Sequence, residues 1–450
     1  MLLKINLLIS GSRQKEIAGR LTKMATLDLL YNNKNQSGRN AIHLAAEKGN
    51  TDIIIKLFSE AKNRPLQQKV FQILREKDKN GQNVFNIAAE KCQNQFFITT
   101  LDRVKRMYTH DEVYVLLNEK NIWGHNAFHL AAERGLNDIL SKIIVEAGII
   151  GFFPKTLDLL SNKNNWGQTV FHLAARSGRK DTILLLIKEG RKCMPQRKLC
   201  ELLLLTDKDG KSALHLASEK NFREIEIIIL KETEKARKLD RLYELLRSKN
   251  ETGRNAFHQA AAQDNGSFVT QTFNDADEVS CKEVISDFLR DKDKNGQNGF
   301  NIAAEKSHNY FFNKALEEGK RRLPRDKVFE IICDKNVWGH NALHLAAERG
   351  LNDMVTVILE EAKQTCNKQK VFDLISSKNK YGQNLLHLAA NKGQSKTVLI
   401  ILKEALKVSS QYKVNELLNE RDNNGKSAMD FASQKNFSDT ITVFLDALKI

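Results

Sequence analysis

A glycine recurs ten times along this 450-residue chain, and each copy stands 43 residues after the one before it. The positions are Gly38, Gly81, Gly124, Gly167, Gly210, Gly253, Gly296, Gly339, Gly382 and Gly425. A short block accompanies the glycine, as in GRNAIHLAAEKG from Gly38 and GQNLLHLAANKG from Gly382. A fixed period of roughly 20 to 50 residues indicates a repeat protein whose units bury their apolar faces only against their neighbours. The period therefore predicts an α-solenoid.

Each repeat contains the signals of a polar hairpin loop followed by three helices. Two residues after the glycine stands a residue that can cap a helix: Asn40, Asn83, Asn126, Thr169, Ser212, Asn255, Asn298, Asn341, Asn384 or Ser427. A side-chain oxygen there accepts hydrogen bonds from free amides of the first helical turn, worth about 1 kcal/mol. The first helix is rich in alanine pairs and is predicted to end at Gly49, Gly135, Gly178, Gly350 and Gly393, or at Asn221 and Asn436. An apolar stripe predicts a second helix, and an apolar knot before the next loop predicts a short third one.

The order glycine, cap, apolar residue, histidine, apolar residue, alanine pair and glycine resembles the ankyrin repeat. The family's Thr-Pro-Leu-His-x-Ala-Ala core corresponds to Asn-Ala-Phe-His-Leu-Ala-Ala at 126–132 and to Ser-Ala-Leu-His-Leu-Ala at 212–217. The resemblance covers roughly residues 35 to 450. The chain departs from the family in lacking the proline and in having a period about ten residues longer, which we interpret as the third helix. The period also fits HEAT or armadillo repeats, so HEAT-like stacking is the alternative architecture.

Seven of the eleven histidines occupy one position of the repeat: His43, His129, His172, His215, His258, His344 and His387. The resemblance implies a structural role for this position, with the imidazole hydrogen-bonded around the loop and the cap. Asn86, Asn301 and Asp430, which fill the position elsewhere, are also polar. We therefore predict no metal site and no cofactor.

A second period of 215 residues suggests that a five-repeat block was duplicated, because residues 121–138 and 336–353 are nearly identical. We expect an N-terminal capping segment over 1–34, a first block over 35–249 and a second block over 250–450. The sixth repeat loses its pattern over 262–280. Just before this region Gln259 replaces a core leucine, and within it Gly266 falls inside the expected second helix. This region is either a hinge, which limited proteolysis would cut first, or a decayed repeat without a mechanical role.

The chain carries a net charge of +16, with basic runs in the second halves of several repeats. The runs are Arg103, Lys105 and Arg106; Lys188, Arg191, Lys192, Arg197 and Lys198; Lys235, Arg237, Lys238 and Arg241; Lys320, Arg321, Arg322, Arg325 and Lys327. Aligned along an array they would attract an acidic partner, an anionic membrane or nucleic acid. The simpler interpretation is that they are solvated helix ends.

We find no motif of a nucleotide-binding loop, a hydrolase nucleophile, a zinc protease or a kinase, so we predict no catalytic residues and no enzyme. The residue before the hairpin glycine is aromatic in four repeats: Trp123, Trp166, Trp338 and Tyr381. In the ankyrin family the hairpin tips and first helices line the partner-binding groove. Exposed aromatic residues are common hot spots of protein interfaces. We predict that these four residues, with His125 and His340, bind a partner; the alternative is that each aromatic ring lies flat on the next finger and stabilises it.

The leading functional prediction is therefore a protein–protein interaction scaffold whose partner is an unknown protein. Binding of nucleic acid or anionic membrane through the basic edge is the alternative. We expect a monomer with no transmembrane segment, since no run of about 18 apolar residues occurs. We expect it to be cytoplasmic, or delivered into a host cell as an effector if the source is an intracellular bacterium.

Overall fold

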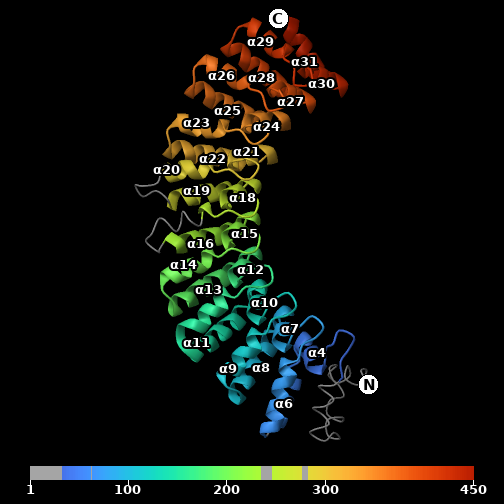
Figure 1. Cartoon of the computed structure of the whole chain (residues 1–450), viewed down its shortest axis with the longest axis vertical. Helices are drawn as coiled ribbons and strands as arrows, with labels where there is room; N and C mark the ends of the chain where they lie inside the picture. The colour runs from blue at the N-terminus through green and yellow to red at the C-terminus, as the bar shows by residue number, and fades with distance from the viewer. Residues whose placement is uncertain (1–32, 62, 235–245, 276–281, 450) are drawn as a thin grey trace. The chain divides into compact units, whose positions relative to one another are not determined.

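The computed structural model describes residues 33–61, 63–234, 246–275 and 282–449, and these residues are mainly helical (Figure 1). Within these ranges no β-strand forms, and the single extended pairing is an isolated bridge between Thr206 and Ser212. The chain divides into two compact units, Met1–Ala217 and Ser218–Ile450. The expected capping segment falls almost wholly outside the described residues. The expected division at residue 250 stays a prediction.

Unit 1 is built from two rows of helices and a series of third helices. The first helices are α4 (Ala41–Lys48), α7 (Val84–Glu90), α10 (Ala127–Arg134) and α12 (Val170–Arg176), and each packs on the next. The second row comprises α5 (Thr51–Glu60), α8 (Asn94–Met107), α11 (Asn137–Ser161) and α13 (Lys180–Cys193), which also pack in sequence. The third helices are α6 (Arg64–Arg75), α9 (His110–Asn118) and α14 (Gln196–Leu204). In the third repeat α11 continues past the point at which α5, α8 and α13 end before the third helices of their repeats. Helix α15 (Ala213–Glu219) contains the boundary between the units.

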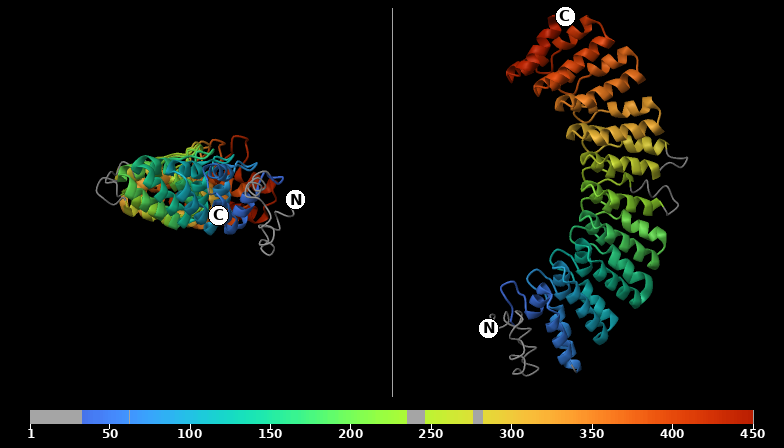
Figure 2. Two further views of the ribbon diagram at one scale, coloured as in Figure 1. Left: turned by 90° about the horizontal axis from the view of Figure 1, so that it is seen from below. Right: turned by 180° about the vertical axis from the view of Figure 1, so that it is seen from behind.

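Unit 2 repeats this organisation. Its first helices are α18 (Ala256–Ala262), α21 (Gly299–Lys306), α24 (Ala342–Arg349), α27 (Leu385–Asn391) and α30 (Ala428–Gln434), and each packs on the next. The second helices are α16 (Arg223–Glu234), α19 (Gly266–Asp275), α22 (Asn309–Arg322), α25 (Asn352–Thr365), α28 (Ser395–Val408) and α31 (Ser438–Lys449). The third helices are α20 (Lys282–Arg290), α23 (Arg325–Cys333), α26 (Lys368–Ile375) and α29 (Gln411–Asn419). Figure 2 shows the same helices from behind, and within each unit the hairpin loops lie beside the first helices. The predicted all-α repeat fold with a third helix is confirmed.

The caps and the alanine pairs explain why the first helices form and stack. Asn126 accepts a hydrogen bond from the amide of His129 at 2.9 Å, and α10 begins one residue after this cap. Ala131 and Ala132 are fully buried, as are the alanine pairs at the same position of the other repeats that have one. Small side chains allow helix axes to approach closely, so neighbouring first helices pack with little space between them.

The residue eleven positions after each hairpin glycine is left-handed. The predicted ends at Gly49, Gly135 and Gly350 are confirmed, with φ of 71°, 78° and 72°. Helices α12 and α27 end two residues before Gly178 and Gly393, which are also left-handed. Five repeats use other residues with positive φ at this position: Cys92, Asn221, Asp264, Ser307 and Asn436. A fixed backbone conformation is therefore kept even where the side chain does not favour it.

The sixth repeat is more regular than its sequence suggests. We expected Gly266 to fall inside the second helix, but it is the first residue of α19 and does not interrupt it. A Cβ there would lie 2.9 Å from Cε1 of Tyr310 on α22, so the glycine permits close packing between the two helices. Asp264 accepts a hydrogen bond from the amide of Phe311 at 2.7 Å. Residues 276–280 of the predicted hinge lie outside the described residues, and its mechanical role stays a prediction.

Candidate functional site

Every hairpin is closed by an Asn or Asp three residues before its glycine. In the third repeat Oδ1 of Asn121 accepts hydrogen bonds from the amides of Trp123 at 3.1 Å and His125 at 2.9 Å. The same two bonds form at Asn35, Asp78, Asn164, Asp207, Asn250, Asp293, Asn336, Asn379 and Asp422. Such side-chain bonds to the following backbone fix a tight turn. Sequence reasoning overlooked this position, although it is Asn or Asp in all ten repeats.

We call the hairpin loop a finger and the residue before its glycine the fingertip. Within each unit, main-chain hydrogen bonds join each finger to the next. The amide of Asn165 donates to the carbonyl of Trp123 at 3.1 Å, and the amide of Lys208 donates to the carbonyl of Trp166 at 2.9 Å. In unit 2, the amides of Lys380 and Asn423 donate to the carbonyls of Trp338 and Tyr381, each at 3.0 Å. The fingertip carbonyl is thus the acceptor of this ladder, and the fingertip side chain takes no part in it.

The hairpin glycine is required by both its backbone angle and its surroundings. Gly382 has a φ of 74°, and a Cβ on it would lie 2.8 Å from the backbone nitrogen of Asn423 in the next finger. Gly425 has the same φ, but a Cβ there would have no atom within 4 Å. The recurring glycine therefore permits both the turn and the close approach of the next finger.

The four aromatic fingertips are solvent-exposed. The relative exposure is 39% for Trp123, 48% for Trp166, 40% for Trp338 and 50% for Tyr381. Ile122, just before Trp123, and Val337, just before Trp338, add apolar surface, because they are exposed to 56% and 43%. A rim of apolar side chains therefore extends over two adjacent fingers in each unit.

His125 links the two tryptophan fingers of unit 1. Its ring lies edge-on to Trp166 at a centroid distance of 5.6 Å and stacks on the buried ring of His129 at 5.8 Å. Nδ2 of Asn164 donates to Nε2 of His125 at 2.7 Å, which requires an unprotonated nitrogen. Burial lowers the pKa of His125, which agrees with a neutral ring. The indole of Trp166 is inclined at 64° to this ring, so the two rings are not stacked.

His340 has the equivalent environment in unit 2. Its ring stacks on His344 at 5.9 Å, and Nδ2 of Asn379 donates to its Nε2 at 2.6 Å. Burial also lowers the pKa of His340. The structure places Trp123, His125 and Trp166 on neighbouring fingers of unit 1, where the rings of His125 and Trp166 are in contact, and it places Trp338, His340 and Tyr381 on neighbouring fingers of unit 2. Both sets lie on adjacent fingers.

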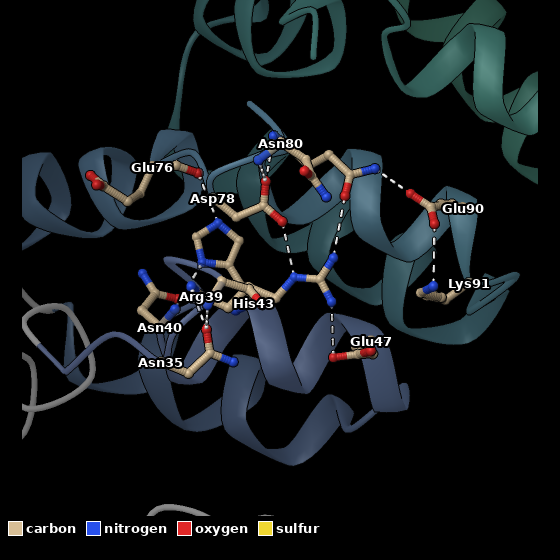
Figure 3. A network of polar contacts seen from close by, with 12 residues as sticks. Asn35, Arg39, Asn40, His43, Glu47, Glu76, Asp78, Asn80, Glu90 and Lys91 are labelled. Atoms are coloured by element: carbon tan, nitrogen blue, oxygen red, sulfur yellow. Dashed lines mark hydrogen bonds and ion pairs between the residues drawn. The ribbon is translucent and has the colours of Figure 1, made fainter. Parts of the chain in front are cut away.

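A charged version of this contact occurs in a repeat without an aromatic fingertip (Figure 3). Nε of Arg39, which also follows a hairpin glycine, donates to Oδ2 of Asp78 in the next finger at 2.9 Å. Nη1 of Arg39 pairs with Glu47 at 3.1 Å. In unit 2 Arg254 and Asp293 repeat the Arg39–Asp78 contact at 3.0 Å. The aromatic fingers replace this ion pair by a neutral histidine–asparagine contact.

The histidines of the repeat core are structural, as the sequence predicted. Nε2 of His129 lies 3.0 Å from the carbonyl oxygen of Asn162, and His344 makes the same contact with Ser377. Asn86 and Asn301 replace the imidazole by an amide that donates to the equivalent carbonyls, of Glu119 and Asp334. No group of histidine, cysteine or acidic residues suited to a metal ion occurs among the described residues.

Carboxylates neutralise much of the basic edge. Lys105 pairs with Glu146 at 2.7 Å, Lys192 with Glu189 at 2.7 Å, and Lys198 with Glu201 at 2.9 Å. Lys320 pairs with Glu361, and Arg322 with Glu318. The run from Lys235 to Arg241 lies outside the described residues. In the part of the chain that the structure covers, no helix has the length and apolarity needed to cross a bilayer.

Residues 99–197 and 300–411 match the family model of ankyrin repeats, which describes three copies. A search of curated proteins finds no match. The two matched segments contain the aromatic fingers of both units.

Proposed function

Because the chain belongs to the ankyrin repeat family, whose members are generally protein–protein interaction modules and typically non-enzymatic scaffolds, we propose that it binds a protein partner through its aromatic fingertips. Fingertip site 1 comprises Ile122, Trp123, His125 and Trp166. Fingertip site 2 comprises Val337, Trp338, His340 and Tyr381. The two sites occupy equivalent positions, 215 residues apart in sequence.

The observation that carries the proposal is the contrast between fixed backbones and exposed aromatic side chains. The Asn turns and the main-chain ladder hold each finger, yet Trp123 and Trp166 keep about two fifths and one half of their surface in water. Large exposed apolar side chains on a preorganised frame lose little conformational entropy on binding. They also bury a large area when a partner covers them.

The tryptophans themselves provide the test, because all three in the chain are fingertip residues. Random linear peptides displayed on phage are selected on the full-length chain, and binders are titrated while tryptophan emission is recorded. We expect the emission to shift to shorter wavelength as water leaves the indoles. We expect binding to be lost in the variant W123A/W166A/W338A/Y381A. Binders that leave the emission unchanged and that still bind this variant would refute the proposal.

We do not extend the proposal to nucleic acid or anionic membrane, since many of the basic side chains are paired with carboxylates. A monomeric state and delivery into a host cell stay predictions from the sequence.

A further inference from the structure

A row of lysines follows the hairpins of both units. The residue four positions before the hairpin glycine is lysine in eight repeats: Lys34, Lys77, Lys120, Lys163, Lys249, Lys292, Lys335 and Lys378. Nζ of Lys120 donates to the carbonyl of Lys163 in the next repeat at 2.8 Å, and Nζ of Lys335 donates to that of Lys378 at 2.8 Å. This contact recurs along the row, so the lysine row is a regular feature of the hairpins.

In most repeats a carboxylate of the following repeat neutralises the lysine. Lys77 pairs with Glu119 at 2.5 Å, and Lys249 pairs with Asp291 at 2.5 Å. Longer pairs join Lys292 to Asp334 at 3.5 Å and Lys378 to Glu420 at 3.4 Å, and Lys34 pairs with Glu76. The acid always stands 42 residues after its lysine.

Three lysines of the row lack this partner, and each stands three residues before a tryptophan fingertip. The residues 42 positions after Lys120, Lys163 and Lys335 are neutral: Asn162, Leu205 and Ser377. Among the described residues no carboxylate lies within ion-pair distance of these three ammonium groups, which are exposed. The acids just before two of them, Glu119 and Asp334, already pair with lysines of the preceding repeats.

The aromatic fingers therefore combine exposed apolar surface with lysines that have no ion-pair partner in the described parts of the chain; the carboxylate of Asp158 acts on Lys120 only from beyond ion-pair distance. Their other contact between fingers, from His125 to Asn164 and from His340 to Asn379, is neutral as well. Two further exposed lysines, Lys208 and Lys380, directly follow the tryptophan fingers in the ladder. A carboxylate of a bound chain that comes within about 8 Å of one of these ammonium groups is attracted to it, because screening at physiological salt becomes strong only beyond that distance.

We propose that the partner of the fingertip sites is an acidic, extended peptide segment whose apolar side chains contact the tryptophans and whose carboxylates face Lys120, Lys163 and Lys335. This inference rests on the proposed function and adds the chemistry of the partner. An extended chain places apolar and acidic residues at short intervals, which suits adjacent fingers that each carry an aromatic fingertip and, three residues before it, a lysine. Electrostatic complementarity of this kind raises association rates and excludes basic partners.

The test compares two double variants with the same change in net charge at the same position of the repeat. K120Q/K163Q removes two uncompensated lysines of site 1, whereas K34Q/K77Q removes two lysines that carboxylates already neutralise. The probes are the linear peptides that phage selection enriches on the intact chain. Melting temperatures of both variants establish that the chain is folded, and K120R/K163R restores the charge.

We expect the enriched peptides to carry net negative charge and aromatic or aliphatic residues. At low ionic strength K120Q/K163Q should weaken their binding at site 1 by about fivefold to twentyfold, roughly twofold to fivefold for each charge. K34Q/K77Q should change it by less than about twofold, and the arginine variant should restore binding. The effect of K120Q/K163Q should shrink as sodium chloride is raised.

Two results would overturn the inference. Enriched peptides that need the tryptophans but are neutral or basic, and that bind K120Q/K163Q normally, would leave the fingertip sites intact and refute their acidic preference. A single-stranded oligonucleotide that displaces the peptides and binds the tryptophan-free variant equally well would show a general polyanion surface. Binding that is indifferent to the tryptophans would instead refute the proposed function itself.

Discussion

The amide of Asn165 donates a hydrogen bond of 3.1 Å to the carbonyl of Trp123, and Nδ2 of Asn165 donates to the carbonyl of Ile122 at 2.8 Å. One asparagine thus fixes the backbone of the exposed apolar pair in the preceding finger. Neither bond involves the side chain of Ile122 or Trp123. Side-chain substitutions at the fingertip should therefore separate binding from folding.

Replacing Trp123 and Trp166 by alanine should abolish binding at fingertip site 1 with little loss of stability. Exposed substitutions usually change the free energy of unfolding by less than about 0.5 kcal/mol, and the lost contact between Trp166 and His125 adds about 0.5–1.5 kcal/mol. Hot-spot residues cost about 2 kcal/mol or more of binding free energy. Thermal unfolding and peptide titration measure the two quantities. L184A, at an exposed leucine of α13, is the control and should keep full binding. A large fall in melting temperature with binding intact would show that the indoles are structural.

The duplicated sites should bind two peptides per chain. Site 2 has the same Asn turns, main-chain ladder and histidine stack as site 1, with Tyr381 in place of Trp166. Calorimetric titration should give a stoichiometry near two for the unaltered chain and near one for W123A/W166A or W338A/Y381A. A stoichiometry of one for the unaltered chain would mean that one site is inactive, or that one peptide occupies both.

Gly382→Ala should destabilise the chain more than Gly425→Ala. Both substitutions place a Cβ on a residue with φ of 74°, which costs about 1–2 kcal/mol. Only at residue 382 does this Cβ approach the amide nitrogen of Asn423, so the ladder bond to Tyr381 is lost there as well, at about 1 kcal/mol more. Urea denaturation of the two variants measures the difference. Equal losses would show that the ladder contributes nothing to stability.

Cys92→Gly should stabilise the chain by about 0.5–1 kcal/mol. Cys92 has a φ of 57°, a conformation that costs a side-chain-bearing residue about 1–2 kcal/mol. Part of this gain is lost because glycine has more conformational freedom in the unfolded chain. The reverse change at the equivalent residue, Gly135→Ala, should destabilise the chain, since its Cβ would meet Cδ of Arg179 at 3.0 Å. Thermal unfolding under reducing conditions tests both, and a lower melting temperature for Cys92→Gly would contradict the prediction.

Stability should fall as the pH falls below about 6.5, and His129→Asn should reduce this dependence. Burial, with a smaller contribution from His125, lowers the pKa of His129 to about 3, and burial lowers the pKa of His172 to about 4. In the unfolded chain an imidazole has its ordinary pKa near 6.5, so between these values the unfolded state binds more protons. The loss is at most about 1.4 kcal/mol per pH unit for each such histidine, and it is absent above pH 7. Asparagine retains a donor for the carbonyl of Asn162, as Asn86 does for Glu119, but does not titrate. An unchanged acid dependence in His129→Asn would exclude this histidine as its source.

The fold was largely predictable because each repeat repeats the same local signals. Asn126 caps α10 and Gly135 ends it, and these local effects need no distant partner. The long helix α11 was not predictable, since the boundary between second and third helix lacks a cap of that kind in the third repeat. The positive φ of Cys92 and Ser307 also escaped prediction, because the surrounding repeats impose a conformation that neither side chain favours.

The candidate site was predictable in its residues but not in its contacts. The aromatic fingertips stand out by their position before the glycine. The edge-on contact of Trp166 with His125 depends on how two fingers are placed, which no local signal encodes. The structure shows that residues 42 and 43 positions apart in sequence are neighbours. With that knowledge, the lysine row and the three repeats that lack an acid 42 residues later can be found in the sequence.

The ladder between fingers also bears on how recognition could change over time. Its donors and acceptors are main-chain atoms, and none of the ten fingertip residues is among those with a positive φ. Any amino acid except proline, whose ring would remove the amide bonded to the turn Asn or Asp, is therefore compatible with the hairpin at these positions. Single substitutions can therefore alter specificity while the scaffold persists. Fingertip sites 1 and 2, which carry Trp166 and Tyr381 at the same position, can change independently of each other.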